Sequence, residues 1–136
     1  MQQIPLFDRP TLNTCKDTKL AMNLAVKQNR LSREEVVDQM NDLAGRCGVS
    51  LVSNGSLKIE TFEKWTNPND LSRQMPMRAL PVFCAVVRDY SALDALAHPL
   101  GAKVVGPKER NLLKWARAYF SARDARKEMR KIEGDL

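Results

Sequence analysis

The sequence predicts an all-α protein, in which a compact bundle of about five short helices is followed by one long C-terminal helix. Two observations support this fold class. Apolar residues recur three and four positions apart along most of the chain, which is the spacing of one face of a helix. Pro and Gly interrupt this pattern at several points between residues 45 and 106, whereas no Pro follows Pro107. The chain therefore changes character near residue 106.

Composition divides the 136 residues into three segments. Residues 1–17, with Pro5 and Pro10, are expected to form an irregular N-terminal arm. Residues 18–106 are expected to form the bundle, since a chain of this length buries a core without disulfide or metal support. Residues 107–136 are expected to form a basic helix. The net charge is +6, and residues 103–136 hold 10 Lys or Arg against 5 Asp or Glu.

The first two predicted helices follow each other after a short turn. Leu20 and Leu24, with Ala21 and Ala25 beside them, predict a helix over 18–29 with one apolar stripe. The second helix has the clearest local signal in the chain. Ser32 and Glu35 form a capping box, Leu31 and Val36 a hydrophobic staple, and Gly45 is placed to end the helix.

A break follows, with a short strand expected at 49–52 and a turn at Asn54-Gly55. Residues 57–65 then predict a short helix. Its apolar face consists of Ile59, Phe62 and Trp65, and its polar face of Lys58, Thr61 and Lys64. A fourth helix is expected over 77–89 with Pro81 in its first turn, and a fifth from Ser91 to Pro99.

The C-terminal helix is predicted from Pro107 to about Glu133, a length of about 40 Å. Because its apolar stripe is too long to bury against so small a bundle, we expect a homodimer or higher homo-oligomer. The residues expected at this dimer contact are Leu112, Trp115, Tyr119, Ala122, Met129 and Ile132. Arg126 and Glu133 interrupt a strict heptad counted from Trp115, which argues against a long regular coiled coil. Alternatively, residues 112–120 pack back on the bundle.

No pattern for catalysis or cofactor binding is present, so an enzyme, a metal site and a small-molecule substrate are not expected. Cys15, Cys47 and Cys84 lack the paired spacing of a zinc site and are expected to be buried free thiols. His98 is the single histidine. Without a leader or an apolar run of about 20 residues, the chain is expected to act in the cytoplasm with no membrane partner.

The basic charge and the helix pair favour double-stranded DNA as the partner. A short helix held by an apolar face is what entry into the major groove requires, and the 58–66 helix meets this demand. The amides near Ser32 at the start of the preceding helix suit a phosphate. The residues predicted to contact DNA are Ser32, Arg33, Arg46, Asn54, Ser56, Lys58, Thr61, Lys64 and Arg73. Because the connection over 45–56 exceeds the usual 3–4 residues, either the turn is expanded or these two helices are not the pair.

Three stretches of sequence resemble small regulators encoded by temperate phages and prophages. They are Ser32-Arg33-Glu34-Glu35-Val36-Val37-Asp38-Gln39-Met40-Asn41, Phe62-Glu63-Lys64-Trp65-x-x-Pro68 and Leu80-Pro81-Val82-Phe83-Cys84. The chain over about 18–101 is similar to the lambda-repressor-like helix-turn-helix group, which includes phage CII-type regulators and small proteins of Mu-like prophages. The resemblance implies that helix 32–44 crosses the DNA backbone and that helix 57–66 reads bases.

Two functional classes remain open. The first is a sequence-specific, dimeric DNA-binding regulator of transcription. The second is a protein–protein adaptor or phage assembly factor that docks through its C-terminal helix. A steep dependence of duplex binding on salt would favour the first class, because a regulator neutralises several phosphates.

Overall fold

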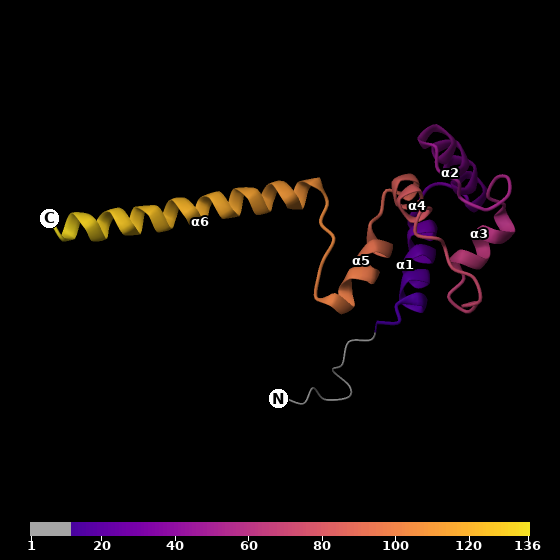
Figure 1. The fold of residues 1–136 in the computed structure, drawn as a ribbon, viewed down its shortest axis with the longest axis horizontal. Coiled ribbons are helices and arrows are strands. Elements are labelled where there is room, and N and C mark those ends of the chain that lie inside the picture. The colour runs from indigo at the N-terminus through magenta and orange to yellow at the C-terminus, as the bar shows by residue number, and fades with distance from the viewer. Residues whose placement is uncertain (1–11) are drawn as a thin grey trace, which may run out of the picture. The chain divides into compact units, whose positions relative to one another are not determined.

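The computed structural model describes residues 12–136, and all regular structure in this range is helical (Figure 1). The predicted all-α class is confirmed. In chain order the elements are α1 (Cys15–Gln28), α2 (Arg33–Cys47), α3 (Ile59–Thr66), α4 (Leu80–Val87), α5 (Ser91–Ala97), the 3-10 turn η2 (His98–Leu100) and α6 (Pro107–Gly134). The chain divides after Val104 into two compact units, and each is described by itself. Residues 1–11, most of the predicted arm, lie outside the described range.

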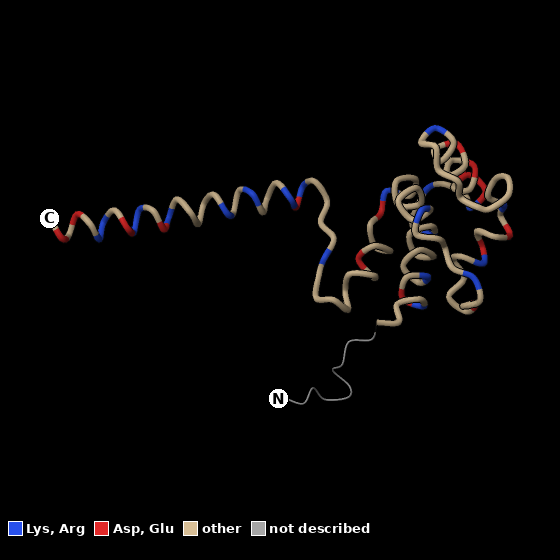
Figure 2. Tube along the Cα trace, viewed as in Figure 1, with Lys and Arg blue, Asp and Glu red and all other residues tan. Residues whose placement is uncertain are grey.

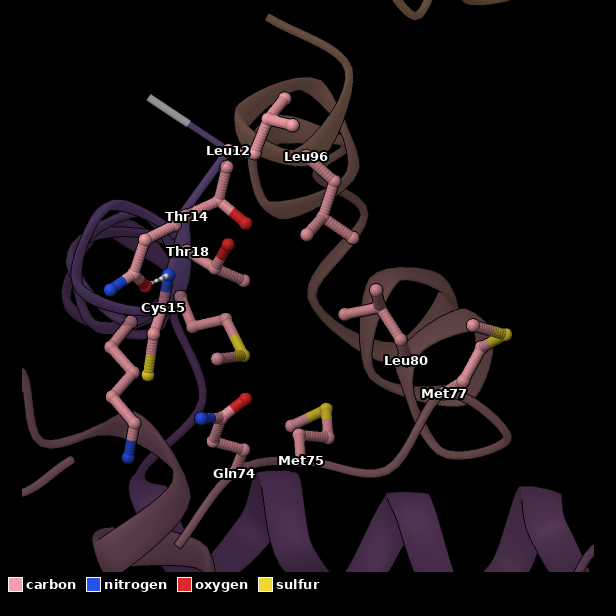
Figure 3. A pocket seen from close by; sticks show the side chains of 12 residues that line it. Leu12, Thr14, Cys15, Thr18, Gln74, Met75, Met77, Leu80 and Leu96 are labelled. Carbon is pink, nitrogen blue, oxygen red and sulfur yellow. Dashed lines mark hydrogen bonds between the residues drawn. The ribbon is translucent and has the colours of Figure 1, made fainter. Parts of the chain in front are cut away.

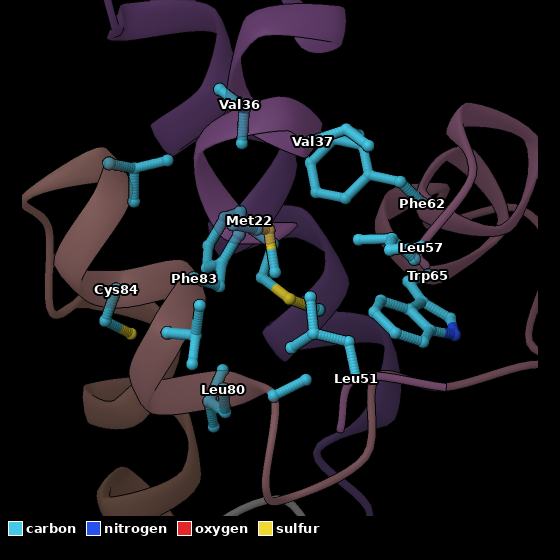
Figure 4. Packing of buried hydrophobic residues seen from close by; sticks show 14 of the residues in the cluster. Met22, Val36, Val37, Leu51, Leu57, Phe62, Trp65, Leu80, Phe83 and Cys84 are labelled. Carbon is cyan, nitrogen blue, oxygen red and sulfur yellow. The ribbon is translucent and has the colours of Figure 1, made fainter. Parts of the chain in front are cut away.

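The first unit packs around one hydrophobic core, which Figure 4 shows. Helix α1 packs against α5 and α3, and α2 packs against α4 and α3. At the centre, the rings of Phe62 in α3 and Phe83 in α4 are fully buried, with centroids 6.1 Å apart. Trp65 is also buried, and Ile59 packs against the cluster from a partly buried position. The apolar face predicted for the short third helix is therefore confirmed.

Helix α1 buries a different face from the predicted one. Leu20 and Leu24 are 47% and 55% exposed, whereas Lys19, Met22 and Val26 face the core. The prediction was wrong because it counted apolar residues, and the buried face of this helix includes a lysine whose ammonium group is satisfied by backbone carbonyls. The helix also begins three residues earlier than the predicted start, at Cys15.

Helix α2 begins with the predicted capping box. The hydroxyl of Ser32 accepts from the amide of Glu35 at 3.1 Å, and the Glu35 carboxylate accepts from the amide of Ser32 at 3.1 Å. The predicted end at Gly45 was wrong. The helix continues to Cys47 and stops at Gly48, whose φ of 70° is the left-handed conformation that ends many helices.

Segments 48–58 and 67–79 consist of bends and turns. The strand predicted at 49–52 was wrong, because residues 12–136 contain no strand. Leu51 is instead buried in the core formed by the helices. The turn predicted at Asn54-Gly55 fits the φ of 74° at Gly55. Helix α4 is shorter than predicted, because Pro81 lacks an amide hydrogen and belongs in a first turn. Arg88 then ends it with a φ of 55°.

The second unit consists mainly of α6, which runs without interruption from Pro107 to Gly134 as predicted. Lys, Arg, Asp and Glu are distributed along its whole length (Figure 2). None of its residues is buried, and Trp115 is 64% exposed. No helix within residues 12–136 has both the length and the apolar composition of a membrane span.

Candidate functional site

A polar groove of about 410 Å³ lies beside α3. Its walls come from three places: the 48–58 segment, the α3 helix and the 67–79 segment. The polar and charged side chains that line it are Ser53, Asn54, Ser56, Lys58, Thr61, Arg73, Gln74 and Arg78. Trp65 also contributes to the lining, and no Asp or Glu is found among the described residues there. The groove therefore combines three cations with neutral hydrogen-bonding groups.

Five residues predicted from sequence to contact DNA meet in this groove: Asn54, Ser56, Lys58, Thr61 and Arg73. Within residues 12–136, the single ion pair joins Arg46 to Asp42. None of the three groove cations therefore forms an ion pair with a carboxylate of the described residues. Such a surface attracts anions more strongly than one whose cations are already paired.

The other four predicted residues lie elsewhere or have other partners. Ser32 is engaged in its own capping box. The guanidinium of Arg33 donates to the Thr66 hydroxyl at 3.1 Å and also to the side-chain oxygen of Asn23, so it links α2 to α3 and α1. Arg46 pairs with Asp42 at 2.8 Å. The exposed Lys64 does not line the groove.

One wall of the groove depends on a buried lysine that the sequence did not reveal. Lys19 of α1 is 1% exposed, and its ammonium group donates to the carbonyl oxygens of Lys64 and Asp70 at 2.7 Å each. It also donates to the carbonyl oxygen of Arg73. An ammonium group has three hydrogens, so all are used. Lys19 thus fixes the backbone at Arg73 relative to α1 and α3.

The wall formed by the 48–58 segment is held in place by an asparagine. The side-chain amide of Asn41 in α2 donates to the carbonyl oxygen of Leu57 at 2.9 Å and accepts from the amide of Leu57 at 2.9 Å. Arg78 connects the 67–79 segment to the 48–58 segment, because its Nε donates to the carbonyl oxygen of Ser50 at 2.6 Å. These contacts hold two irregular segments in place beside α3.

Sequence reasoning missed Ser53, Gln74 and Arg78 at the groove. All three lie in the irregular segments before and after α3, where no periodic pattern marks an exposed or buried face. The cationic character of Arg73 and Arg78 was visible, but their proximity to Lys58 arises only when the 67–79 segment folds back across α3.

Two titratable groups in the described part of the first unit have shifted pKa values. Burial raises the pKa of the Cys84 thiol to about 11, so this group stays protonated near neutral pH. Hydrogen bonds from Ser72 lower the pKa of Asp70. Cys84 is buried as predicted, but Cys47 is exposed and Cys15 is half-buried, which corrects the prediction for these two residues. No cluster of three His, Cys, Asp or Glu side chains that could hold a metal occurs in the described chain.

A second cavity of about 390 Å³ has a mainly apolar lining. Figure 3 shows Met75, Leu80 and Leu96 around it, with Thr18 on the α1 side. The Thr18 hydroxyl is buried and has no hydrogen-bond partner among the described residues. None of the residues predicted from sequence to contact DNA lines this cavity.

The resemblance to phage regulators remains a prediction, since it rests on short stretches of sequence. No protein-family model matches this chain, and no curated protein or solved structure matches it.

Proposed function

We propose that the protein binds double-stranded DNA through the groove beside α3 and regulates transcription. The observation that carries this proposal is the convergence of Lys58, Arg73 and Arg78 on one groove without an acidic residue in its lining. Cations that neutralise phosphates supply most of the affinity of such proteins, because they release counterions from the DNA. Asn54 and Gln74 add amide groups that suit phosphate or base contacts.

Helix α3 is the element that we assign to base reading. Phe62 and Trp65 anchor it in the core, while Lys58 and Thr61, together with an edge of Trp65, line the groove. It packs against α2, as the second helix of a helix-turn-helix packs against the first. In this proposal the long connection over 48–58 is an expanded turn that supplies part of the DNA-contacting surface.

The complete proposal is a dimeric, cytoplasmic regulator of phage or prophage origin. Dimerisation is supported by the exposed apolar side chains of α6, and two copies would present two α3 helices to successive half-sites. The phage origin rests on the sequence resemblance alone. Ser32, Arg33, Arg46 and Lys64 are not assigned to the contact, because they do not line the groove.

The salt dependence of DNA binding tests this proposal. We would compare the full chain with K58A/R73A and with a control, K16A/K27A, which removes two exposed lysines of α1. For a random duplex, log K decreases as log salt increases. The magnitude of this negative slope should be smaller by about two in K58A/R73A, because each missing cation leaves one phosphate without its neutralising partner. The control should keep the slope of the full chain. Equal slopes for all three proteins would contradict the proposed groove.

A protein–protein adaptor is the second candidate. It is favoured by the exposed apolar side chains of α6, such as Trp115 and Met129. The same salt titration separates the two candidates, since an adaptor has no reason to release counterions from duplex DNA.

A further inference from the structure

A continuous apolar seam runs along α6 at alternating spacings of three and four residues. Its members are Trp115, Ala118, Ala122, Ala125, Met129 and Ile132. If Trp115 occupies heptad position a, no charged residue interrupts the seam over about 27 Å. The register considered from sequence placed Trp115 at position d instead, and there Arg126 and Glu133 interrupt it. The uninterrupted register is therefore the one suited to pairing.

We propose that this seam is covered by the same seam of a second copy of the chain, in antiparallel orientation. Trp115 then lies opposite Ile132 of the partner subunit, and Ala118 lies opposite the partner's Met129. The central layer joins Ala122 to the partner's Ala125. This inference specifies the partner of α6 within the proposed self-association, and it does not depend on DNA binding.

Side-chain size favours the antiparallel arrangement. A parallel pair stacks Trp115 on its own copy, follows this with three successive alanine layers, and ends with paired Met129 and paired Ile132. The distance between the helix axes would have to change sharply along such a seam. The antiparallel pair combines a small with a large residue at Ala118 and Met129 and keeps alanine pairs only at the centre. The layer size then decreases evenly toward the middle from both ends.

The charges beside the seam favour the same orientation. In a parallel pair, a residue at position g lies beside the residue at position e in the partner's following heptad. Glu128 would then lie beside the partner's Glu133, and the two-fold symmetry would repeat this contact on the other edge of the seam. In the antiparallel pair, Glu128 lies beside the partner's Ser121, and Lys114 lies beside the partner's Asp135. No like charges then meet along the edges.

A stacked aromatic pair lies along one edge of the seam. The ring of Tyr119 stacks on that of Trp115, with centroids 5.5 Å apart and an interplanar angle of 17°. With Trp115 at position a, Tyr119 occupies position e, beside the seam. In the antiparallel pair it meets the partner's Arg126, and a guanidinium group over a tyrosine ring is a favourable contact.

Disulfide trapping tests the orientation in the full chain. The parent carries C15S, C47S and C84A, and its circular dichroism must match that of the unmodified chain. Single variants A118C and M129C are oxidised alone and as a mixture in which one carries an affinity tag. The antiparallel pair predicts a mixed A118C–M129C disulfide, with far less of either homodimer. The matched control mixes F120C with K127C, which stand at the same axial level on the outer face and should not cross-link.

Each outcome has a distinct meaning. Dominant A118C homodimers would show a parallel pair and overturn the antiparallel proposal while leaving self-association intact. A full chain that sediments as a monomer at tens of micromolar, together with no cross-link, would overturn both. Loss of DNA binding alone would leave this inference untouched.

A second measurement uses E128K, which should change the dimer Kd less than about twofold in the antiparallel pair. A parallel pair would instead tighten, because Lys replaces a repelling Glu.

Discussion

The ammonium group of Lys19, buried in α1, donates a 2.7 Å hydrogen bond to the carbonyl oxygen of Lys64 in the last turn of α3. The carbonyl end of a helix carries partial negative charge, so a cation is stabilised there. Two further carbonyls, those of Asp70 and Arg73, complete its hydrogen bonding. One side chain therefore connects the helix that we assign to base reading with the segment that carries Arg73.

Replacement of Lys19 tests this connection. K19M keeps much of the side-chain volume but leaves three carbonyls without their donor, at a cost of roughly 1–3 kcal/mol for each buried group. We expect the free energy of unfolding to fall by about 3 kcal/mol in urea titrations. K27M, which changes an exposed lysine of the same helix, should stay within about 0.5 kcal/mol of the original chain. A K19M protein as stable as K27M would contradict the role given to Lys19.

The paired hydrogen bonds between Asn41 and Leu57 give a second prediction. N41A removes both partners of the Leu57 backbone, so we expect a loss of about 1–3 kcal/mol. In a domain of this size, the melting temperature should fall by about 4–8 °C for each kcal/mol. N111A, at an exposed position of α6, is the control and should melt like the original chain. Equal melting temperatures for the two variants would show that Asn41 does not hold the start of α3.

The two tryptophans should differ sharply in their contribution to stability. W65A removes a buried ring from the core, and we expect a loss of about 3–5 kcal/mol. W115A removes an exposed ring from α6 and should leave the unfolding of the first unit within about 0.5 kcal/mol. Urea unfolding followed by circular dichroism would measure both. A smaller loss for W65A than for W115A would be inconsistent with the core described.

The thiols provide a prediction about pH. Because burial raises the pKa of Cys84 from 9.0 to about 11, the folded protein holds this proton more tightly than the unfolded chain does. The resulting stabilisation is complete below about pH 9 and is lost as the pH rises toward 11. The free energy of unfolding, measured from about pH 9 to pH 11, should therefore decrease with pH by an amount that is absent from C84A. If C84A follows the same pH profile as the original chain, burial of Cys84 does not produce this effect.

Thiol labelling of the native protein at pH 8 gives an independent check on burial. Exposed Cys47 should react with a disulfide reagent within minutes, whereas buried Cys84 should react only as the protein opens. C47S identifies the fast phase. In C15S/C47S protein Cys84 is the single thiol, and its rapid labelling in the native state would contradict its burial.

Part of the candidate site was predictable from the sequence. The sequence placed Lys58 and Thr61 on the polar face of α3, because Ile59 and Phe62 mark the buried face by their spacing, and both polar residues line the groove. Arg33 was assigned to DNA from its position at a helix start. The structure shows its guanidinium bonded to Thr66 and Asn23, partners that lie on other helices and leave no local signal in the sequence.

The sequence by itself determined the features that depend on neighbouring residues. These are the helical class, the capping box at Ser32 and Glu35, the first turns at Pro81 and Pro107, and the single long C-terminal helix. Each is decided by hydrogen bonds and steric limits within a few residues. Only the tertiary structure decided which face α1 buries. A lysine is buried there because carbonyls 45 or more positions away along the chain accept its hydrogen bonds, and no local pattern encodes such partners.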